Sequence, residues 1–349
     1  MEINKIADKA SKYYNIKSYN IINIHKSSRG GDDLRYTYIL QDNSDGYKIA
    51  LKITKNIFTT SERIDGWAAL AEHYNNLGIY APRFLKNTKN KFSSSIEGFA
   101  VYAEEYYEGK TGDEADIKDK SLRTDVLKSL GIVAANPAPI VPWYTAWCLY
   151  DTFDESDEVD ENFRCAINFA DYIAENLPAY SEQANNILNK YKTMRSEFEA
   201  EYRSLPKSVF QGDLNGSNIL LTDDGKFKGV CDFNLSGTET ILNILFCECC
   251  ECWSGAEEEK IARITAASTQ YEFDNKAAED LAVVGEYYKF SDKEKYAFTK
   301  YYNITYPFRW INYGFYMYHL RESGEKYAFD IFEWIERQMS RSDIGQILA

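Results

Sequence analysis

Apolar and polar residues alternate along the first part of the chain in a way that is typical of a β-sheet. Three segments show this alternation: 21–27, 34–41 and 47–54. In the last of them, Ile49, Leu51 and Ile53 fall on one face of the strand, and the residues between them fall on the other. A strong turn signal, Asp-Asn-Ser-Asp-Gly, occupies 42–46. The pattern therefore predicts three consecutive antiparallel strands.

The period then changes from that of a strand to that of a helix. Residues 61–77 are expected to form a helix that begins at an N-cap, Ser61, and ends before Gly78. Two further strands are expected around 83–87 and 97–105. These elements would together form a small sheet with one helix beside it.

The pattern beyond about residue 110 is mainly helical. Long helical periodicity covers 160–202, and residues 255–340 are again mainly helical. Between these stretches, residues 209–237 are expected to form a short β-rich segment, in which Asp-Asp-Gly at 223–225 supplies the turn. The sequence thus predicts an α+β protein in which a β-hairpin is set into a helical region.

The chain has 349 residues, which is too long for one small core and indicates two lobes. We expect an N-terminal lobe over 1–107, built on a small antiparallel sheet. A larger, mainly helical C-terminal lobe is expected over 108–349.

Charge and composition narrow the class of protein. The net charge of −14 argues against a nucleic-acid partner, whose binding depends on neutralising phosphates, and it is compatible with a cationic small substrate. No run of about 18 apolar residues occurs, and the first twenty residues lack an apolar signal core. We therefore expect no membrane span and a cytoplasmic location. Four of the seven cysteines crowd into 247–252, and we expect them to be reduced and packed rather than to bind a metal.

Two motifs of the β-rich segment place polar side chains among apolar neighbours. The first holds Asp213 and, five positions later, Asn218, and the second holds Asp232. These side chains could merely cap a turn and end a strand, but their combination favours a site, because isolated polar groups are costly there. Asn218 and Asp232 offer hard oxygen ligands that suit Mg²⁺, and Asp213 could orient or deprotonate an attacking hydroxyl.

These two motifs, QGDLNGSNIL and GVCDF, resemble the catalytic and metal-binding segments of one family of enzymes. It is the aminoglycoside phosphotransferase and choline kinase-like family. That family consists of small-molecule kinases with a protein-kinase-like two-lobe fold. The match is close over 210–233, and the order of the preceding elements extends it loosely over most of the chain. The resemblance implies Asp213 as the catalytic carboxylate and Asn218 and Asp232 as Mg²⁺ ligands.

The chain departs from the family pattern at two positions of these motifs. Cys231 replaces Ile or Val, which is a mild change because Cys packs as a small hydrophobe. Gln211 replaces the usual His, and this matters more. If that His braces the loop, the Gln amide can do the same, whereas an acid–base role would be lost. Bracing is the favoured interpretation, because Asp213 is retained.

The resemblance also assigns the third strand to nucleotide binding. Ala50 and Lys52 share a face, where small Ala50 leaves room for a flat base and Lys52 reaches phosphate oxygens. An acid on the following helix should hold Lys52 in place, and Glu62 and Asp65 are both candidates. Gly30 and Gly31 lie where a loop would cover the phosphates, although the G-x-G-x-x-G spacing is missing.

The hinge between the lobes is expected within 101–109. Backbone groups of Glu104, Glu105 and Tyr106 would there meet the edge of the adenine base, so that their side chains carry little information. ATP is the expected nucleotide, and GTP stays open as an alternative.

The acceptor side is less specified. Acidic residues that could meet an amine follow the metal motif or form a charged run: Glu239, Glu248, Glu251, 257–259 and 151–161. Aromatic residues that could stack on a ring or a cation are Trp253, Trp310 and Tyr313. Solvated charge and ordinary packing are the more common explanations for both sets.

The leading interpretation is an ATP- and Mg²⁺-dependent kinase that phosphorylates a hydroxyl of a small molecule. An aminoglycoside-like antibiotic, and hence antibiotic resistance, is the first guess. A metabolic kinase for choline, an amino alcohol or a sugar is the alternative within enzymes. A nucleotide-binding pseudokinase is a further alternative, to which only Gln211 points. A protein kinase is disfavoured, because no Ala-Pro-Glu segment follows Asp232.

Overall fold

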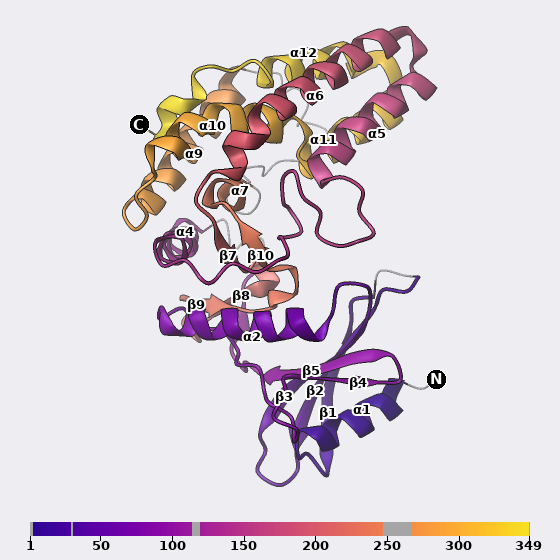
Figure 1. Ribbon diagram of the computed structural model, residues 1–349, viewed down its shortest axis with the longest axis vertical. Coiled ribbons are helices and arrows are strands. Elements are labelled where there is room, and N and C mark those ends of the chain that lie inside the picture. The colour runs from indigo at the N-terminus through magenta and orange to yellow at the C-terminus, as the bar shows by residue number, and fades with distance from the viewer. Residues whose placement is uncertain (1–2, 29–30, 114–118, 247–266, 349) are drawn as a thin grey trace.

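The computed structural model describes residues 3–28, 31–113, 119–246 and 267–348. A twisted sheet lies at one end of the molecule and a group of helices at the other, with α2 between them (Figure 1). The α+β organisation expected from the sequence is confirmed. The expected lobe boundary falls between β5 and β6 and stays a prediction.

The N-terminal lobe is a five-stranded antiparallel sheet, in the order β1-β2-β3-β5-β4, with one helix on each side. Its elements are α1 (Ile3–Tyr13), β1 (Tyr19–Lys26), β2 (Leu34–Asp42), β3 (Lys48–Lys55), α2 (Ser61–Asn76), β4 (Ser93–Ile96) and β5 (Phe99–Glu105). The three predicted strands at 21–54 are therefore confirmed as β1, β2 and β3. The alternation in β3 is confirmed too, because Ile49, Leu51 and Ile53 are all buried.

Helix α1 is an element that the strand pattern did not reveal. Ile6, Ala7 and Ala10 are buried on its inner face, and they belong to the same core as Ile49 and Leu51 of β3. Their spacing is that of a helix, i, i+1 and i+4, although the flanking charges hide it in the sequence. This helix therefore covers the face of β3 that points away from α2.

Two local expectations in this lobe were wrong. The N-cap of α2 is Thr60, not Ser61, and its hydroxyl accepts a hydrogen bond from Arg63 N at 3.2 Å. The segment 83–87 is not a strand: it forms one isolated bridge, from Phe84 to Glu104. Asn87 turns the chain away instead, because its side chain bonds the backbone of the following loop.

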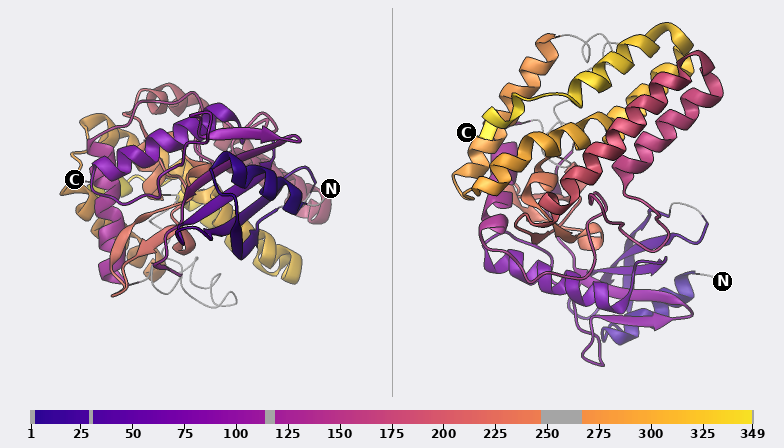
Figure 2. Two further views of the ribbon diagram at one scale, coloured as in Figure 1. Left: turned by 90° about the horizontal axis from the view of Figure 1, so that it is seen from below. Right: turned by 45° about the horizontal axis from the view of Figure 1, so that its top comes forward.

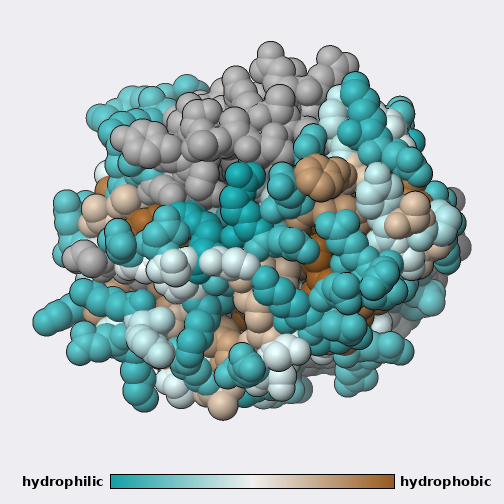
Figure 3. Space-filling model, turned by 90° about the horizontal axis from the view of Figure 1, so that it is seen from above, coloured by the Kyte–Doolittle hydropathy of each residue, from teal (hydrophilic) through white to brown (hydrophobic). Residues whose placement is uncertain are grey.

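The C-terminal lobe is mainly helical, and α5 and α6 lie side by side in it (Figure 2). Its longer helices are α4 (Lys120–Ala135), α5 (Glu161–Asn176), α6 (Ser181–Arg203), α9 (Ala267–Gly285), α10 (Asp292–Thr305), α11 (Trp310–Ser323) and α12 (Ala328–Gln338). The helical stretch expected over 160–202 is interrupted, because Pro178 opens a short 3-10 turn, η1 (Pro178–Tyr180). Seen from above, the end formed by the helices is mainly hydrophilic, with small hydrophobic areas (Figure 3).

Short strands form the β-rich segment between α6 and the following helices. They make two small sheets, β7–β10 and β6–β8–β9, in which neighbouring strands are antiparallel. The elements are β6 (Lys110–Thr111), β7 (Ser208–Phe210), η2 (Gly216–Asn218), β8 (Ile219–Leu221), β9 (Phe227–Val230), η3 (Phe233–Leu235), β10 (Gly237–Glu239) and α7 (Ile241–Ile244). Gly225, at φ 81°, sits in the predicted Asp-Asp-Gly turn.

Helix α2 connects the two lobes through its buried side chains. Trp67 and Tyr74 belong to the larger hydrophobic core, which also contains Phe233 of η3. The rings of Tyr74 and Phe233 lie edge to face, 5.4 Å apart. The β-rich segment is thereby held against α2 and the sheet. None of the described helices is long and apolar enough to cross a membrane.

Candidate active site

Gln211 joins the two sequence motifs through three hydrogen bonds. Its Nε2 donates to the carbonyl oxygens of Cys231 and Asp232, each at 2.8 Å, and its Oε1 accepts from Asp213 N at 2.7 Å. The side chain is 1 % exposed, so that water does not compete for these bonds. A neutral imidazole has one donor and one acceptor, so Gln makes one bond more here than His can.

The backbone at Gly212 explains how Asp213 is presented. Gly212 has φ 76°, and a Cβ there would lie 2.6 Å from Leu235 O, so only glycine fits. The next residue, Asp213, is half-buried, and its carboxylate accepts hydrogen bonds from the amides of Asn218 at 2.9 Å and Asn215 at 2.8 Å. These bonds fix the orientation of the carboxylate that sequence analysis assigned to the acceptor hydroxyl.

The β8–β9 hairpin brings Asn218 and Asp232 to the same place, as expected. Ile219 pairs with Val230, and Cys231 N donates to Asn218 O at 2.9 Å. Asp232 follows at once with φ 57°, in the left-handed region that few residues other than glycine adopt. Because Asn218 donates through Nδ2 to Asp213, its amide oxygen is the atom left to serve a cation.

Lys52 reaches the second motif from the sheet. Its Nζ lies 3.1 Å from Asp232 Oδ1 and 3.1 Å from Glu104 Oε1. The prediction that an acid on the helix holds Lys52 was wrong, because Glu62 and Asp65 both lie on the exposed side of α2. The pairing of Glu104 with Lys52 was not predicted, because only backbone groups of Glu104 were expected to matter. Strand pairing gives the signal in retrospect, since Glu104 is opposite Ala50.

The charges around Lys52 keep it cationic. Burial alone would lower the pKa of Lys52, but Asp232 and Glu104 outweigh burial and hold that pKa well above its ordinary value. Burial also raises the pKa of Glu104, and the nearby ammonium group offsets part of this effect. The site therefore holds the positive charge of Lys52 next to two carboxylates, those of Glu104 and of Asp232 in the second motif.

The expected hinge is only partly available to a nucleotide base. Ala50 is buried and faces the same side of the sheet as Glu104. However, Glu105 N donates to Arg83 O at 2.9 Å, and Tyr106 N donates to Lys48 O at 3.4 Å. Because these two N–H groups already donate within the protein, a base would have to contact backbone carbonyl groups of this segment or residues after Tyr106.

The acidic and aromatic candidates of the acceptor side have different surroundings. Glu239 is buried and accepts hydrogen bonds from the hydroxyl of Tyr202 and from Thr240 N, so it does not face an exposed amine. The ring of Trp310, 42 % exposed, stacks on Trp147 at 6.2 Å. Tyr313 packs against the large core. The remaining candidates lie outside the described residues: Glu248, Glu251, Trp253 and 257–259. The cysteines at 247–252, which were expected to be reduced and packed, lie outside them as well.

The charged run at 151–161 is not simply a solvated surface. The side chain of Asp160 is 2 % exposed and pairs with Arg195, and Asp151 pairs with Arg203 at 3.0 Å. Together with Asp33 of the β1–β2 loop, this segment lines a cavity of about 300 Å³. Trp147 also lines it and donates from Nε1 to Gly212 O at 3.0 Å, next to Asp213. The cavity therefore adjoins the catalytic motif.

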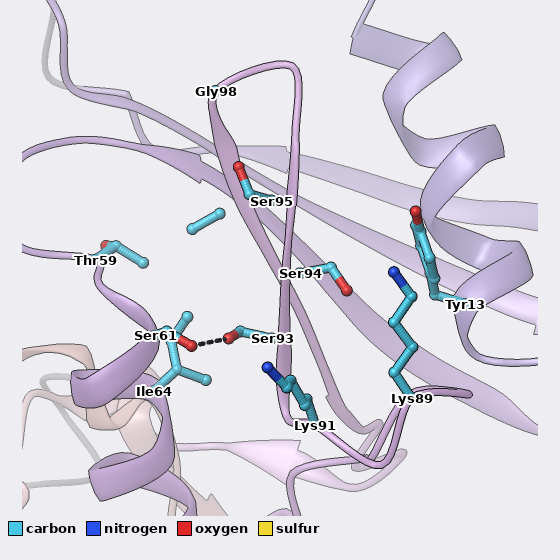
Figure 4. A pocket seen from close by; sticks show the side chains of 11 residues that line it. Tyr13, Thr59, Ser61, Ile64, Lys89, Lys91, Ser93, Ser94, Ser95 and Gly98 are labelled. Carbon is cyan, nitrogen blue, oxygen red and sulfur yellow. Dashed lines mark hydrogen bonds between the residues drawn. The ribbon is translucent and has the colours of Figure 1, made fainter.

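A larger cavity, of about 440 Å³, lies elsewhere in the N-terminal lobe (Figure 4). It is formed by the end of α1, the start of α2 and strand β4, and the hydroxyls of Ser61 and Ser93 are hydrogen-bonded at 2.8 Å beside it. None of the residues assigned to catalysis, nucleotide or metal lines this cavity. It is separate from the candidate active site.

Comparisons with known proteins place this geometry in a structural class. No protein-family model matches the sequence, and no curated protein matches it. Among solved structures, the chain is similar to an amicoumacin kinase in complex with AMP-PNP, Ca²⁺ and Ami. The identity is 14 %, the alignment covers 99 % of this chain and 94 % of that chain, and the TM-score is 0.55. This likeness confirms the kinase-like two-lobe fold and, at the level of fold, the resemblance to the small-molecule kinases.

Two further solved structures are similar over nearly the whole chain. One is a spectinomycin phosphotransferase in complex with ADP and spectinomycin, at 12 % identity, with 99 % and 97 % of the two chains covered and a TM-score of 0.48. The other is a choline kinase from Cryptosporidium parvum Iowa II, at 13 % identity, with 99 % and 94 % covered and a TM-score of 0.46.

Proposed function

We propose that the protein is an ATP- and Mg²⁺-dependent phosphotransferase that phosphorylates a hydroxyl of a small, amine-bearing molecule. One observation carries the proposal: the fold brings Lys52 of β3 to the two motifs that hold Asp213, Asn218 and Asp232, and Gln211 fastens these two motifs to each other. A lysine for the phosphates, oxygen ligands for a metal and a carboxylate for the nucleophile are the parts that phosphoryl transfer requires.

The donor atoms fit Mg²⁺ in kind. Asp232 offers a carboxylate and Asn218 an amide oxygen, and this ion prefers a few protein oxygens together with water and phosphate. When bound, Mg²⁺ would neutralise the phosphate oxygens. Lys52 would contribute a positive charge to the phosphates, and Asp213 would orient the acceptor hydroxyl and take its proton.

The acidic cavity beside the catalytic motif supports a cationic acceptor. Its lining contains six carboxylates and two guanidinium groups, among them Asp154 and the paired residues Asp33 and Arg35. Several of these acids are already paired, but the lining as a whole remains negative, which favours an ammonium group. Aminoglycoside-like antibiotics, choline-like compounds and amino alcohols are the acceptor classes that this cavity suits.

Substrate-dependent release of ADP tests the proposal. Hydroxyl compounds that carry amines are compared with matched compounds that lack them, in the presence of ATP and Mg²⁺. Asp213→Asn keeps the shape of the side chain and removes its charge, so turnover should fall by about 10²–10⁴-fold while ATP affinity stays the same. Asp223→Asn, on the exposed β8–β9 turn, is the matched control.

Two results would contradict the proposed reaction, and a third would contradict the proposed class of acceptor. Unchanged turnover in Asp213→Asn would show that another group activates the hydroxyl. ATP binding without turnover of any acceptor in a broad screen would favour the pseudokinase alternative. A preference for acceptors without an amine would contradict the cationic class alone.

A further inference from the structure

Lys52 has two carboxylate partners, and they are not equivalent. Asp232 belongs to the motif that is proposed to bind Mg²⁺, and its side chain is 35 % exposed. Glu104 belongs to the sheet, and its side chain is 7 % exposed. If Asp232 held a metal ion, its carboxylate would be shared with that ion, whereas Glu104 would still be available to Lys52 alone.

The backbone of Glu104 is fixed from both sides. Glu104 pairs with Ala50 in the β3–β5 ladder, and on its other side it bridges to Phe84. Tyr102, two residues earlier on the same face, lies opposite Lys52, whose Nζ is 5.7 Å from the centre of the ring. The sheet therefore sets the place of the Glu104 carboxylate, and hence the direction in which Lys52 extends.

Helix α2 offers no replacement for Glu104. Its buried side chains in the described structure are apolar or aromatic, such as Ile64, Trp67 and Ala68, and Trp67 packs on Tyr102 at 5.8 Å. The two acids in its first half, Glu62 and Asp65, are exposed. The helix thus contributes packing to the region of Lys52, while the charge comes from β5.

We propose that Glu104 is the positioning residue of Lys52, in the role that sequence analysis gave to an acid on α2. This inference rests on the proposed function, because its purpose is to keep the ammonium group directed at the phosphates while Asp232 is engaged by the metal. Glu104 acts through Lys52 and does not itself touch the reacting atoms.

A double-mutant cycle between Lys52→Met and Glu104→Gln tests this role. Turnover and urea unfolding are both measured for the parent, the two single variants and the double variant. We expect Glu104→Gln to lower turnover about tenfold in the parent and to change it little in Lys52→Met, because residues that act as a unit are not additive. Glu104→Asp keeps the charge and should fall between the parent and Glu104→Gln.

The urea unfolding measurements do not depend on catalysis. The effect of Glu104→Gln on the equilibrium constant of unfolding should differ about tenfold between the Lys52 and Lys52→Met backgrounds, because removing the lysine leaves a buried carboxylate unpaired. Glu62→Gln and Asp65→Asn are the matched controls, and both should be additive with Lys52→Met in both measurements.

Additive unfolding for Lys52 and Glu104 would overturn the inference. So would coupled unfolding with additive turnover, because Glu104 would then stabilise the sheet without positioning the lysine. Absence of ADP release in the parent protein contradicts the proposed function instead, and this is seen before any variant is compared.

Discussion

Replacement of Gln211 by Glu should destabilise the protein strongly, although the two side chains have nearly the same size. In the structure, Nε2 donates to Cys231 O and Asp232 O at 2.8 Å, while Oε1 accepts from Asp213 N. A carboxylate can still accept from Asp213, but it cannot donate to the two carbonyl groups. Gln211→Glu therefore removes two bonds and places a negative charge against two carbonyl oxygens.

The size of the effect follows from burial. Gln211 is 1 % exposed, so water cannot replace the lost donors. Each buried polar group left unsatisfied costs about 1–3 kcal/mol, so two of them cost about 2–6 kcal/mol, before the cost of burying a charge. Both carbonyl groups flank the turn that carries Asp232, so its carboxylate should lose its defined position as well.

The loss should also depend on pH. Burial raises the pKa of the introduced carboxyl group in the folded protein above its value of about 4.3 in the unfolded chain. At pH values between these two pKa values, the folded protein binds more protons than the unfolded chain does. The free energy of unfolding therefore falls as pH rises through that range. At low pH the carboxyl group is protonated and can donate one hydrogen bond again. The difference in the free energy of unfolding between the variant and the parent should therefore be smaller at low pH.

Urea unfolding of the parent and of Gln211→Glu at pH 5 and pH 7 measures this difference. Gln346→Glu is the control, because Gln346 is exposed on the short turn η8 (Ile344–Leu348). A free energy of unfolding within about 0.5 kcal/mol of the parent at pH 7, which is the usual range for surface changes, would refute the bracing role. A large loss that is the same at both pH values would refute the charge argument.

Three other predictions test the metal site and the core. Asp232→Asn should weaken the dependence of ATP affinity on Mg²⁺, and calorimetric titrations with the same Mg²⁺ dependence in both proteins would exclude the metal role. Burial raises the pKa of Glu239 from 4.5 to about 7, so its contribution to stability is present below pH 4.5 and is lost as pH rises through 7. Glu239→Gln should therefore reduce the loss of stability between pH 5 and pH 8 in urea unfolding, and an unchanged pH profile would count against it. Asp160→Ala should destabilise by about 3–5 kcal/mol, because it leaves the buried charge of Arg195 without its carboxylate partner. Asp224→Ala, which removes an exposed pair with Lys226, should change stability far less than Asp160→Ala does, so equal losses would contradict the role of burial.

The sequence alone was enough for features that depend on neighbouring residues. The alternation at 47–54 located β3 and the face that Lys52 occupies, because side chains of a strand alternate regardless of what the strand packs against. The spacing of Asp213, Asn218 and Asp232 predicted a hairpin that brings Asn218 and Asp232 together, and the Asp-Asp-Gly turn at 223–225 lies where it was expected.

Features that depend on distant residues were decided only by the tertiary structure. Glu104 becomes the partner of Lys52 because β5 pairs with β3, and the sequence does not state which strands are neighbours. Asp160 appears in the sequence as one acid in a charged run, yet the packing of α5 and α6 buries it against Arg195. The exposed positions of Glu62 and Asp65 likewise follow from how α2 is rotated against the sheet.

Gln211 combines a property that the sequence predicted with one that only the tertiary structure decided. Its residue type suggested that it could brace the loop, because an amide offers donors and an acceptor. Only the fold places Cys231 O, Asp232 O and Asp213 N within reach of one side chain. Local periodicity and hydrogen-bonding capacity can be derived from the sequence, but the choice of partner depends on contacts between segments that the chain brings together on folding.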